Sequence, residues 1–159
     1  MIINIIILLI SIVIFGFVFN IFNNTKQAKM LNFNIDKNNN TPILTVKQDD
    51  IELNFILDTG SSVSAIDSNM LNQIYAHKLN KTGQVVGIDG IPEEVHWYEI
   101  PFSCNNYEYN HTFVAKDLLL AFQSIEESMG KRIHGLIGSD FCNENGFVIN
   151  FQTQSVYAK

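Results

Sequence analysis

An apolar run in this chain ends directly in an acidic residue. Phe55, Ile56 and Leu57 are followed without a spacer by Asp58. Such a run is typical of a strand that enters a core, and a charged carboxylate at its end is costly unless another group compensates it or a reaction uses it. A strand-end Asp can also close a tight turn through its side chain, so Asp58 alone leaves both interpretations open.

Strand and turn signals dominate the sequence on both sides of this run. Apolar residues at helical spacing predict helices over 68–76 and 117–129. Apolar or alternating stretches bounded by turn residues predict short strands at 43–46, 51–57, 63–66, 84–86, 95–100, 102–104, 112–115, 147–151 and 156–157. We therefore predict a mostly-β domain over residues 41–159 with one or two short helices.

The first 22 residues have a different character. Residues 5–19 are apolar except for Ser11 and Gly16, and further apolar residues flank them. About 20 apolar residues suffice to cross a bilayer as a helix, whereas a buried helix of a soluble domain is rarely apolar on every side. A cleaved signal peptide needs a basic start and a small-residue cleavage site, and neither occurs here. We predict a single-pass transmembrane anchor over residues 1–22, with the cleaved signal peptide as the alternative.

A polar, Asn-rich stretch over residues 23–40 separates this segment from the predicted domain, and we interpret it as a linker. Lys26 and Lys29 follow the apolar segment directly, and no basic residue precedes it. Basic residues concentrate on the cytoplasmic side of membrane spans, so these two favour a cytoplasmic domain, although two lysines leave the side of the membrane open.

The composition argues against several classes of function. The net charge of −6 over 159 residues, without a dense Lys/Arg cluster, does not fit a nucleic-acid partner, because neutralising phosphates requires a basic surface. Cys104, Cys142 and the four scattered histidines show no zinc-ligand spacing. We predict no metal and no cofactor, and two buried thiols in preference to a disulfide, which stays possible in an oxidising compartment.

Three motifs occur in a fixed order along the predicted domain. Asp58-Thr59-Gly60-Ser61 follows the apolar strand, a hairpin with the tip Gly87-Ile88-Asp89-Gly90 comes next, and Leu136-Ile137-Gly138 precedes a short helix over 139–143. In this order and spacing the chain resembles the retropepsin-like aspartic proteases over nearly all of residues 41–159. The resemblance implies a single-lobed acid protease fold.

The resemblance also implies roles for the motif residues. Asp58 would be the catalytic carboxylate. The active-site loop beside it would comprise Thr59, Gly60 and Ser61. The tip of the substrate-binding flap would comprise Gly87, Ile88, Asp89 and Gly90. The structural segment behind the active site would comprise Leu136, Ile137 and Gly138.

Hydrolysis by this route needs two carboxylates that share one proton, because like charges about 3 Å apart cannot both ionise. Asp-Thr-Gly occurs once in this chain, so a two-fold homodimer would pair Asp58 with its symmetry mate. The predicted function is a membrane-anchored homodimeric aspartic endopeptidase that acts on peptides or proteins. The alternative is a non-catalytic peptide-binding or dimerisation module of the same fold.

Overall fold

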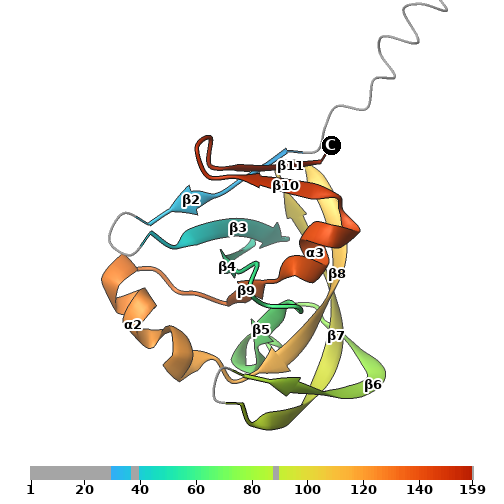
Figure 1. Cartoon of the computed structure of the whole chain (residues 1–159). Helices are drawn as coiled ribbons and strands as arrows, with labels where there is room; N and C mark the ends of the chain where they lie inside the picture. The colour runs from blue at the N-terminus through green and yellow to red at the C-terminus, as the bar shows by residue number, and fades with distance from the viewer. Residues whose placement is uncertain (1–29, 37–39, 88–89, 159) are drawn as a thin grey trace, which may run out of the picture.

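The structure is a computed structural model that describes residues 30–36, 40–87 and 90–158. The chain folds mainly into β-strands, with two short helices beside them (Figure 1). The elements are, in order, β1 Met30–Asn32, β2 Asn34–Ile35, β3 Pro42–Gln48, β4 Ile51–Leu57, β5 Ala65–Asp67, a 3₁₀ turn Ser68–Met70, β6 His77–Val86, β7 Pro92–Cys104, β8 Tyr107–Lys116, α2 Leu119–Met129, β9 Gly135–Ile137, α3 Ser139–Glu144, β10 Phe147–Asn150 and β11 Ser155–Ala158.

One large sheet carries most of the fold. Its strands lie in the order β2-β3-β4-β9-β5-β8-β7-β6, and a further pairing between β3 and β7 closes part of the sheet on itself. In the centre, β4 runs parallel to β9, and Leu57 lies opposite Ile137. Parallel neighbours need a long crossover, which here comprises β5 to β8 and α2. The end of β4 therefore lies beside a strand from the C-terminal part of the chain.

A smaller sheet joins the two ends of the described chain in the order β1-β11-β10. Leu31 pairs with Val156, and both Leu31 and Phe33 are almost fully buried in the main core. The predicted linker over residues 23–40 is therefore wrong for residues 30–35, which form β1 and β2. These residues belong to the domain because they supply apolar surface that the core buries.

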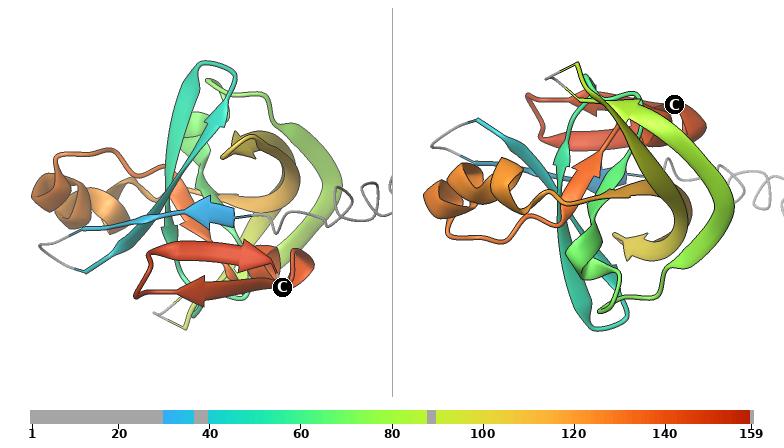
Figure 2. Two further views of the ribbon diagram at one scale, coloured as in Figure 1. Left: turned by 90° about the horizontal axis from the view of Figure 1, so that it is seen from above. Right: turned by 90° about the horizontal axis from the view of Figure 1, so that it is seen from below.

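Two apolar clusters fill the molecule. The larger joins both sheets and contains Phe55, Phe102 and Phe113, and the ring of Phe113 stacks on Phe55 and meets Phe102 edge-on. The smaller joins α2 to the large sheet through Leu118 and Phe122. Both views of Figure 2 place α2 at one edge of the molecule and the long curved strands at the opposite edge.

The mostly-β class is confirmed, and each predicted strand overlaps an observed one. The helix predicted over 117–129 is α2, and the short helix predicted over 139–143 is α3. The helix predicted over 68–76 is wrong, because only the 3₁₀ turn forms there. The backbone N–H and carbonyl oxygen of Tyr75 both bond to the side chain of Gln48, which removes groups that a helix would need.

The predicted membrane anchor over residues 1–22 lies outside the described residues. Across residues 30–36, 40–87 and 90–158, no helix has both the length and the apolar character needed to span a bilayer.

Candidate active site

The Asp58 loop leaves the large sheet at the end of β4. The Asp58 backbone N–H donates to the carbonyl oxygen of Ile137 at 2.9 Å, which extends the pairing of β4 with β9 by one residue. Asp58 is half-buried, whereas Thr59 and Gly60 are exposed. The carbonyl oxygen of Asp58 accepts the N–H of Ser61 at 3.2 Å. The loop is therefore a tight turn that holds a carboxylate at the protein surface.

The Asp58 carboxylate uses one of its oxygens to close this turn. Oδ1 accepts the Gly60 N–H at 2.9 Å, which is the bond that a purely structural Asp would make. The other oxygen, Oδ2, makes no hydrogen bond with any described residue. The turn thus orients the carboxylate while leaving one oxygen for chemistry.

The segment Leu136-Ile137-Gly138 lies directly behind this loop. The Gly138 N–H donates to Ser64 Oγ at 3.0 Å. The next residue, Ser139, donates both its N–H and its hydroxyl to the Ser61 carbonyl oxygen, at 2.8 and 2.9 Å. The start of α3 therefore fixes the Asp58 loop from behind.

The hairpin of β6 and β7 ends in a glycine turn. The Gly90 N–H donates to the Gly87 carbonyl oxygen at 3.0 Å. Gly90 has φ +73°, a conformation that favours glycine. The other two predicted tip residues, Ile88 and Asp89, lie outside the described residues.

This hairpin shares an apolar cluster with the residues around the Asp58 loop. Val85 and Trp97 from the hairpin pack in the smaller cluster, which also contains Val63 and Leu136. Val63 follows the loop in sequence, and Leu136 precedes the residue that bonds to the Asp58 N–H. The hairpin and the residues beside the loop therefore pack against the same apolar cluster.

A buried polar cluster behind the loop is absent from the sequence-based prediction. Ser64 donates its N–H and its hydroxyl to the two carboxylate oxygens of Asp140, each at 2.8 Å. His111 Nε2 lies 3.0 Å from Ser64 Oγ, and Nδ1 lies 2.8 Å from Glu144 Oε2. The members come from β8, α3 and the segment before β5, so no local spacing in the sequence signals the cluster.

This cluster determines the charge of Asp140. Burial alone would raise the pKa of its carboxyl group, but hydrogen bonds from His111, Ser64 and the Phe141 N–H hold the pKa below its usual range. Ser64, His111 and Asp140 are the residue types of a serine-hydrolase triad. Ser64 is fully buried, however, and its hydroxyl contacts three protein groups, so it cannot act as a nucleophile on a substrate.

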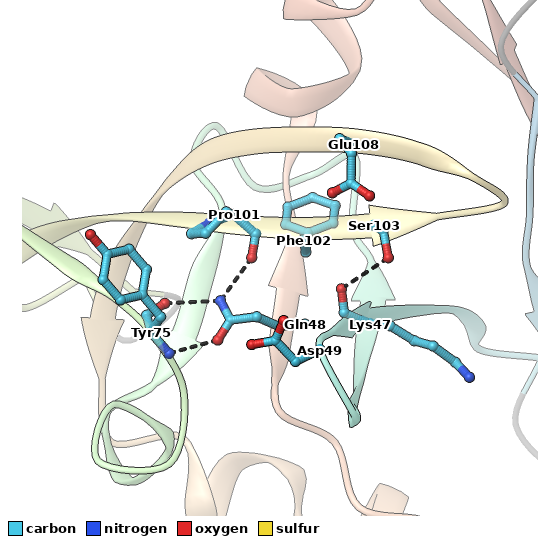
Figure 3. Close-up of a pocket in the computed structure, with 8 residues that line it drawn as sticks. All are labelled: Lys47, Gln48, Asp49, Tyr75, Pro101, Phe102, Ser103 and Glu108. Carbon is cyan, nitrogen blue, oxygen red and sulfur yellow. Dashed lines mark hydrogen bonds between the residues drawn. The ribbon is translucent and has the colours of Figure 1, made fainter.

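A separate cavity of about 420 Å³ lies at the turn between β3 and β4 (Figure 3). The amide of Gln48 donates to the carbonyl oxygens of Tyr75 and Pro101 and accepts the Tyr75 N–H, so its hydrogen-bonding capacity is largely used within the chain. The cavity lies at the opposite end of β4 from Asp58, and we do not assign it to the active site. Its lining residues are Lys47, Gln48, Asp49, Tyr75, Pro101, Phe102, Ser103 and Glu108.

Within the described part of the chain, no three His, Cys, Asp or Glu side chains form a group that could hold an ion. Cys104 and Cys142 are both buried free thiols, and burial raises the pKa of Cys104 to about 11. Neither thiol is therefore a reactive nucleophile near neutral pH.

Comparison with known proteins gives a family match. A family model described as "Aspartyl protease" matches residues 44–141, a range that begins in β3 and ends in α3. It includes the Asp58 loop, the β6–β7 hairpin and the segment Leu136-Ile137-Gly138. No curated protein matches the chain.

Proposed function

The chain belongs to an aspartyl protease family of the retropepsin-like clan, and from this premise we propose that it is a membrane-anchored, homodimeric aspartic endopeptidase. The observation that carries the proposal is the Asp58 loop, which presents a half-buried carboxylate on a turn held from behind by β9 and α3. A module that only binds peptides has no need for this carboxylate.

In the proposed reaction, Asp58 and the partner's Asp58 share one proton. The ionised carboxylate takes a proton from a water molecule while the water oxygen attacks the scissile carbonyl carbon. The protonated carboxylate gives its proton to the carbonyl oxygen. Collapse of the tetrahedral intermediate breaks the C–N bond. The leaving amine takes a proton from the protonated carboxyl group while one hydroxyl of the intermediate returns its proton to the ionised carboxylate, so the pair again holds one shared proton.

A second copy of the chain is needed because one copy does not supply two catalytic carboxylates. Asp-Thr-Gly occurs once in the sequence. Asp140 is the acidic residue closest to the loop in the supporting segment, but it already accepts three hydrogen bonds from Ser64 and the Phe141 N–H. It therefore cannot serve as the second catalytic carboxylate, which a two-fold dimer would supply.

Two surface features favour such a dimer. Thr59 and Gly60 are exposed beside Asp58, so a second copy can approach the loop closely. In the described part of the chain, β1 and β10 each pair with β11 alone and leave their outer edges unpaired. An open sheet edge is a template for pairing with another chain.

The membrane anchor rests on the apolar residues 5–19 and is part of the proposal. Tethering two copies to one bilayer raises their effective concentration, which favours a dimer of modest intrinsic affinity. The substrate would be a peptide or an unfolded protein segment bound in extended form beneath the β6–β7 hairpin.

The test uses the full chain in bilayer vesicles, incubated with a diverse peptide mixture from about pH 4 to 7.5, with products read by mass spectrometry. We expect Asp58→Asn to lower the cleavage rate by about a thousandfold or more, because it removes the acid–base group. Asp49→Asn is the matched control, since Asp49 is an exposed turn residue at the far end of β4. Cleavage that survives in Asp58→Asn would refute the proposal.

Mixing the two chains tests the dimer separately. An excess of the Asp58→Asn chain, added to a fixed amount of parent chain, should suppress cleavage because mixed dimers carry only one Asp58. Undiminished cleavage would contradict a shared site. If the parent chain cleaves nothing at any pH but sediments as a dimer, the non-catalytic peptide-binding or dimerisation module becomes the better interpretation.

A further inference from the structure

His111 is a titratable side chain buried in the supporting layer of the active-site loop. It lies in β8 with 3% of its surface exposed, and Phe113 and Phe141 meet its ring edge-on at centroid distances of 5.2 and 5.0 Å. The ionisable groups that face it both come from α3. Nδ1 lies 2.8 Å from Glu144 Oε2, and Nε2 lies 3.4 Å from Asp140 Oδ2. A ring buried this deeply needs a partner for each nitrogen.

The hydrogen bonds of Ser64 determine whether Nε2 of His111 donates or accepts a hydrogen bond. The Ser64 hydroxyl oxygen accepts the Gly138 N–H at 3.0 Å, and the hydroxyl donates its single proton to Asp140 Oδ1 at 2.8 Å. His111 Nε2 lies 3.0 Å from the same oxygen. Since a hydroxyl has one proton and two lone pairs, only an accepting lone pair is left for His111. Nε2 must therefore donate.

The other ring nitrogen faces a group that only accepts. An ionised Glu144 carboxylate has no proton to give, so Nδ1 also donates. An imidazole that donates from both nitrogens is the doubly protonated imidazolium. Its positive charge lies between the carboxylates of Asp140 and Glu144.

The cluster connects directly to the Asp58 loop. Asp140 holds both the N–H and the hydroxyl of Ser64, and Ser64 lies three residues beyond Ser61. Ser139 precedes Asp140 and holds the Ser61 carbonyl oxygen with two hydrogen bonds. A residue that orients Asp140 and Ser64 therefore also orients the C-terminal side of the Asp58 loop.

We infer that His111 is a positioning residue of the active site, which acts as an imidazolium held by Glu144 and keeps the Ser64 hydroxyl directed at Asp140. The inference rests on the proposed function, because it assigns His111 to the support of that same loop. If Nε2 loses its proton it becomes an acceptor and competes with Asp140 for the Ser64 hydroxyl proton. One of the hydrogen bonds that fix the loop is then lost.

Nuclear magnetic resonance of the ring nitrogens tests the protonation state. The full-length Asp58→Asn chain, in micelles and labelled with ¹⁵N-histidine, is examined at neutral pH beside the same chain with Glu144→Gln added. We expect both ring nitrogens of His111 to carry protons in the chain that retains Glu144. In the chain with Glu144→Gln, one of the two ring nitrogens should be unprotonated, because Nδ1 no longer faces a carboxylate.

Kinetics of the chain with an intact Asp58 test the positioning role. Glu144 is largely exposed on α3, so Glu144→Gln removes its charge without opening the core. We expect kcat to fall about tenfold while KM changes less than about twofold, because the variant misplaces the reacting carboxylate and touches no substrate. Glu127→Gln is the matched control, an exposed carboxylate on α2 that bonds only within its own helix, and it should change neither constant.

Two results would overturn the inference. The first is a His111 with an unprotonated ring nitrogen in the chain that retains Glu144. The second is a Glu144→Gln chain with the parental kcat. A parent chain without peptidase activity would instead overturn the proposed function, and the positioning role with it. The NMR result would still establish the protonation state of His111, because it is obtained on the Asp58→Asn chain.

Discussion

Replacing Gly138 with alanine tests the packing behind the active-site loop most directly. Gly138 has φ −86°, which any residue adopts, so this position needs glycine for space and not for its backbone conformation. An added Cβ would lie 2.7 Å from both the backbone carbon and the oxygen of Val63, and 2.9 Å from Asp140 Oδ1. Ordinary contact begins at 3.4 Å, so one of two backbone segments must move by about 0.7 Å.

The expected cost can be worked out from these contacts. Overpacking a tight site costs about 1–3 kcal/mol. The displacement also strains the bonds from the Gly138 N–H to Ser64 and from Ser139 to Ser61, each worth about 1 kcal/mol net. We expect a loss of about 3 kcal/mol in the free energy of unfolding, a large part of the roughly 5–15 kcal/mol that a domain has.

Urea denaturation of residues 24–159, at one fixed protein concentration, measures this loss. With a slope of about 2 kcal/mol per molar urea, the midpoint should fall by about 1.5 M without a change in slope. Gly130→Ala is the matched control: its site is open, but its φ is +63°, so it should cost only about 1–2 kcal/mol of backbone strain. A Gly138→Ala loss below about 0.5 kcal/mol would show that the close contact with Val63 relaxes freely, and the reasoning would fail.

Two further predictions concern residues far from this contact. Leu31→Ala should lower the free energy of unfolding by about 3 kcal/mol in the same urea assay, because it opens a cavity in the main core. Met30→Ala, at a half-exposed site, should change it by less than about 0.5 kcal/mol. Equal effects of the two substitutions would contradict the assignment of β1 to the domain. Burial, followed by the charge of Arg132, lowers the pKa of His134, whose Nδ1 accepts the Asn54 N–H at 2.9 Å. The folded state thus binds fewer protons than the unfolded state, so this contribution to stability is present above about pH 6.5 and declines as the pH falls through the lowered pKa. His134→Asn, which keeps an acceptor but cannot titrate, should flatten the stability curve between about pH 7 and 5, and an unchanged curve would refute this origin.

The strands that surround the active site could be predicted because each carries its own local signal. Residues 51–57 alternate between apolar and polar side chains and end in the apolar run Phe55-Ile56-Leu57 before a turn motif, and two short, largely apolar segments flank the polar turn at 152–154. The resemblance to the retropepsin-like proteases then placed Leu136-Ile137-Gly138 behind the Asp58 loop, and β4 does pair with β9. Local patterns therefore predicted the strands, whereas the pairing of β4 with β9 was implied by the family resemblance.

Tertiary contacts account for what the sequence did not reveal. Leu31 and Phe33 alternate over too few residues, within an Asn-rich stretch, to indicate a strand, and the partner of β1 lies at the other end of the chain. The apolar spacing over 68–76 is helical, but the Gln48 amide takes the backbone groups of Tyr75. His111 gave no signal at all, because its partners meet it only after β8 and α3 have packed together.

The position of β1 links the proposed anchor to the proposed dimer. β1 begins at Met30, so residues 23–29 alone separate the predicted span from the first strand. The unpaired outer edges of β1 and β10 therefore lie near the point where the chain would leave the bilayer. Figure 1 places this sheet at the opposite end of the molecule from β6. Two anchored copies would thus meet through their membrane-proximal sheets and present their hairpins away from the bilayer. In this arrangement the anchor would promote catalysis by concentrating and aligning the two copies, while β9, α3 and His111 would position the Asp58 loop within each copy.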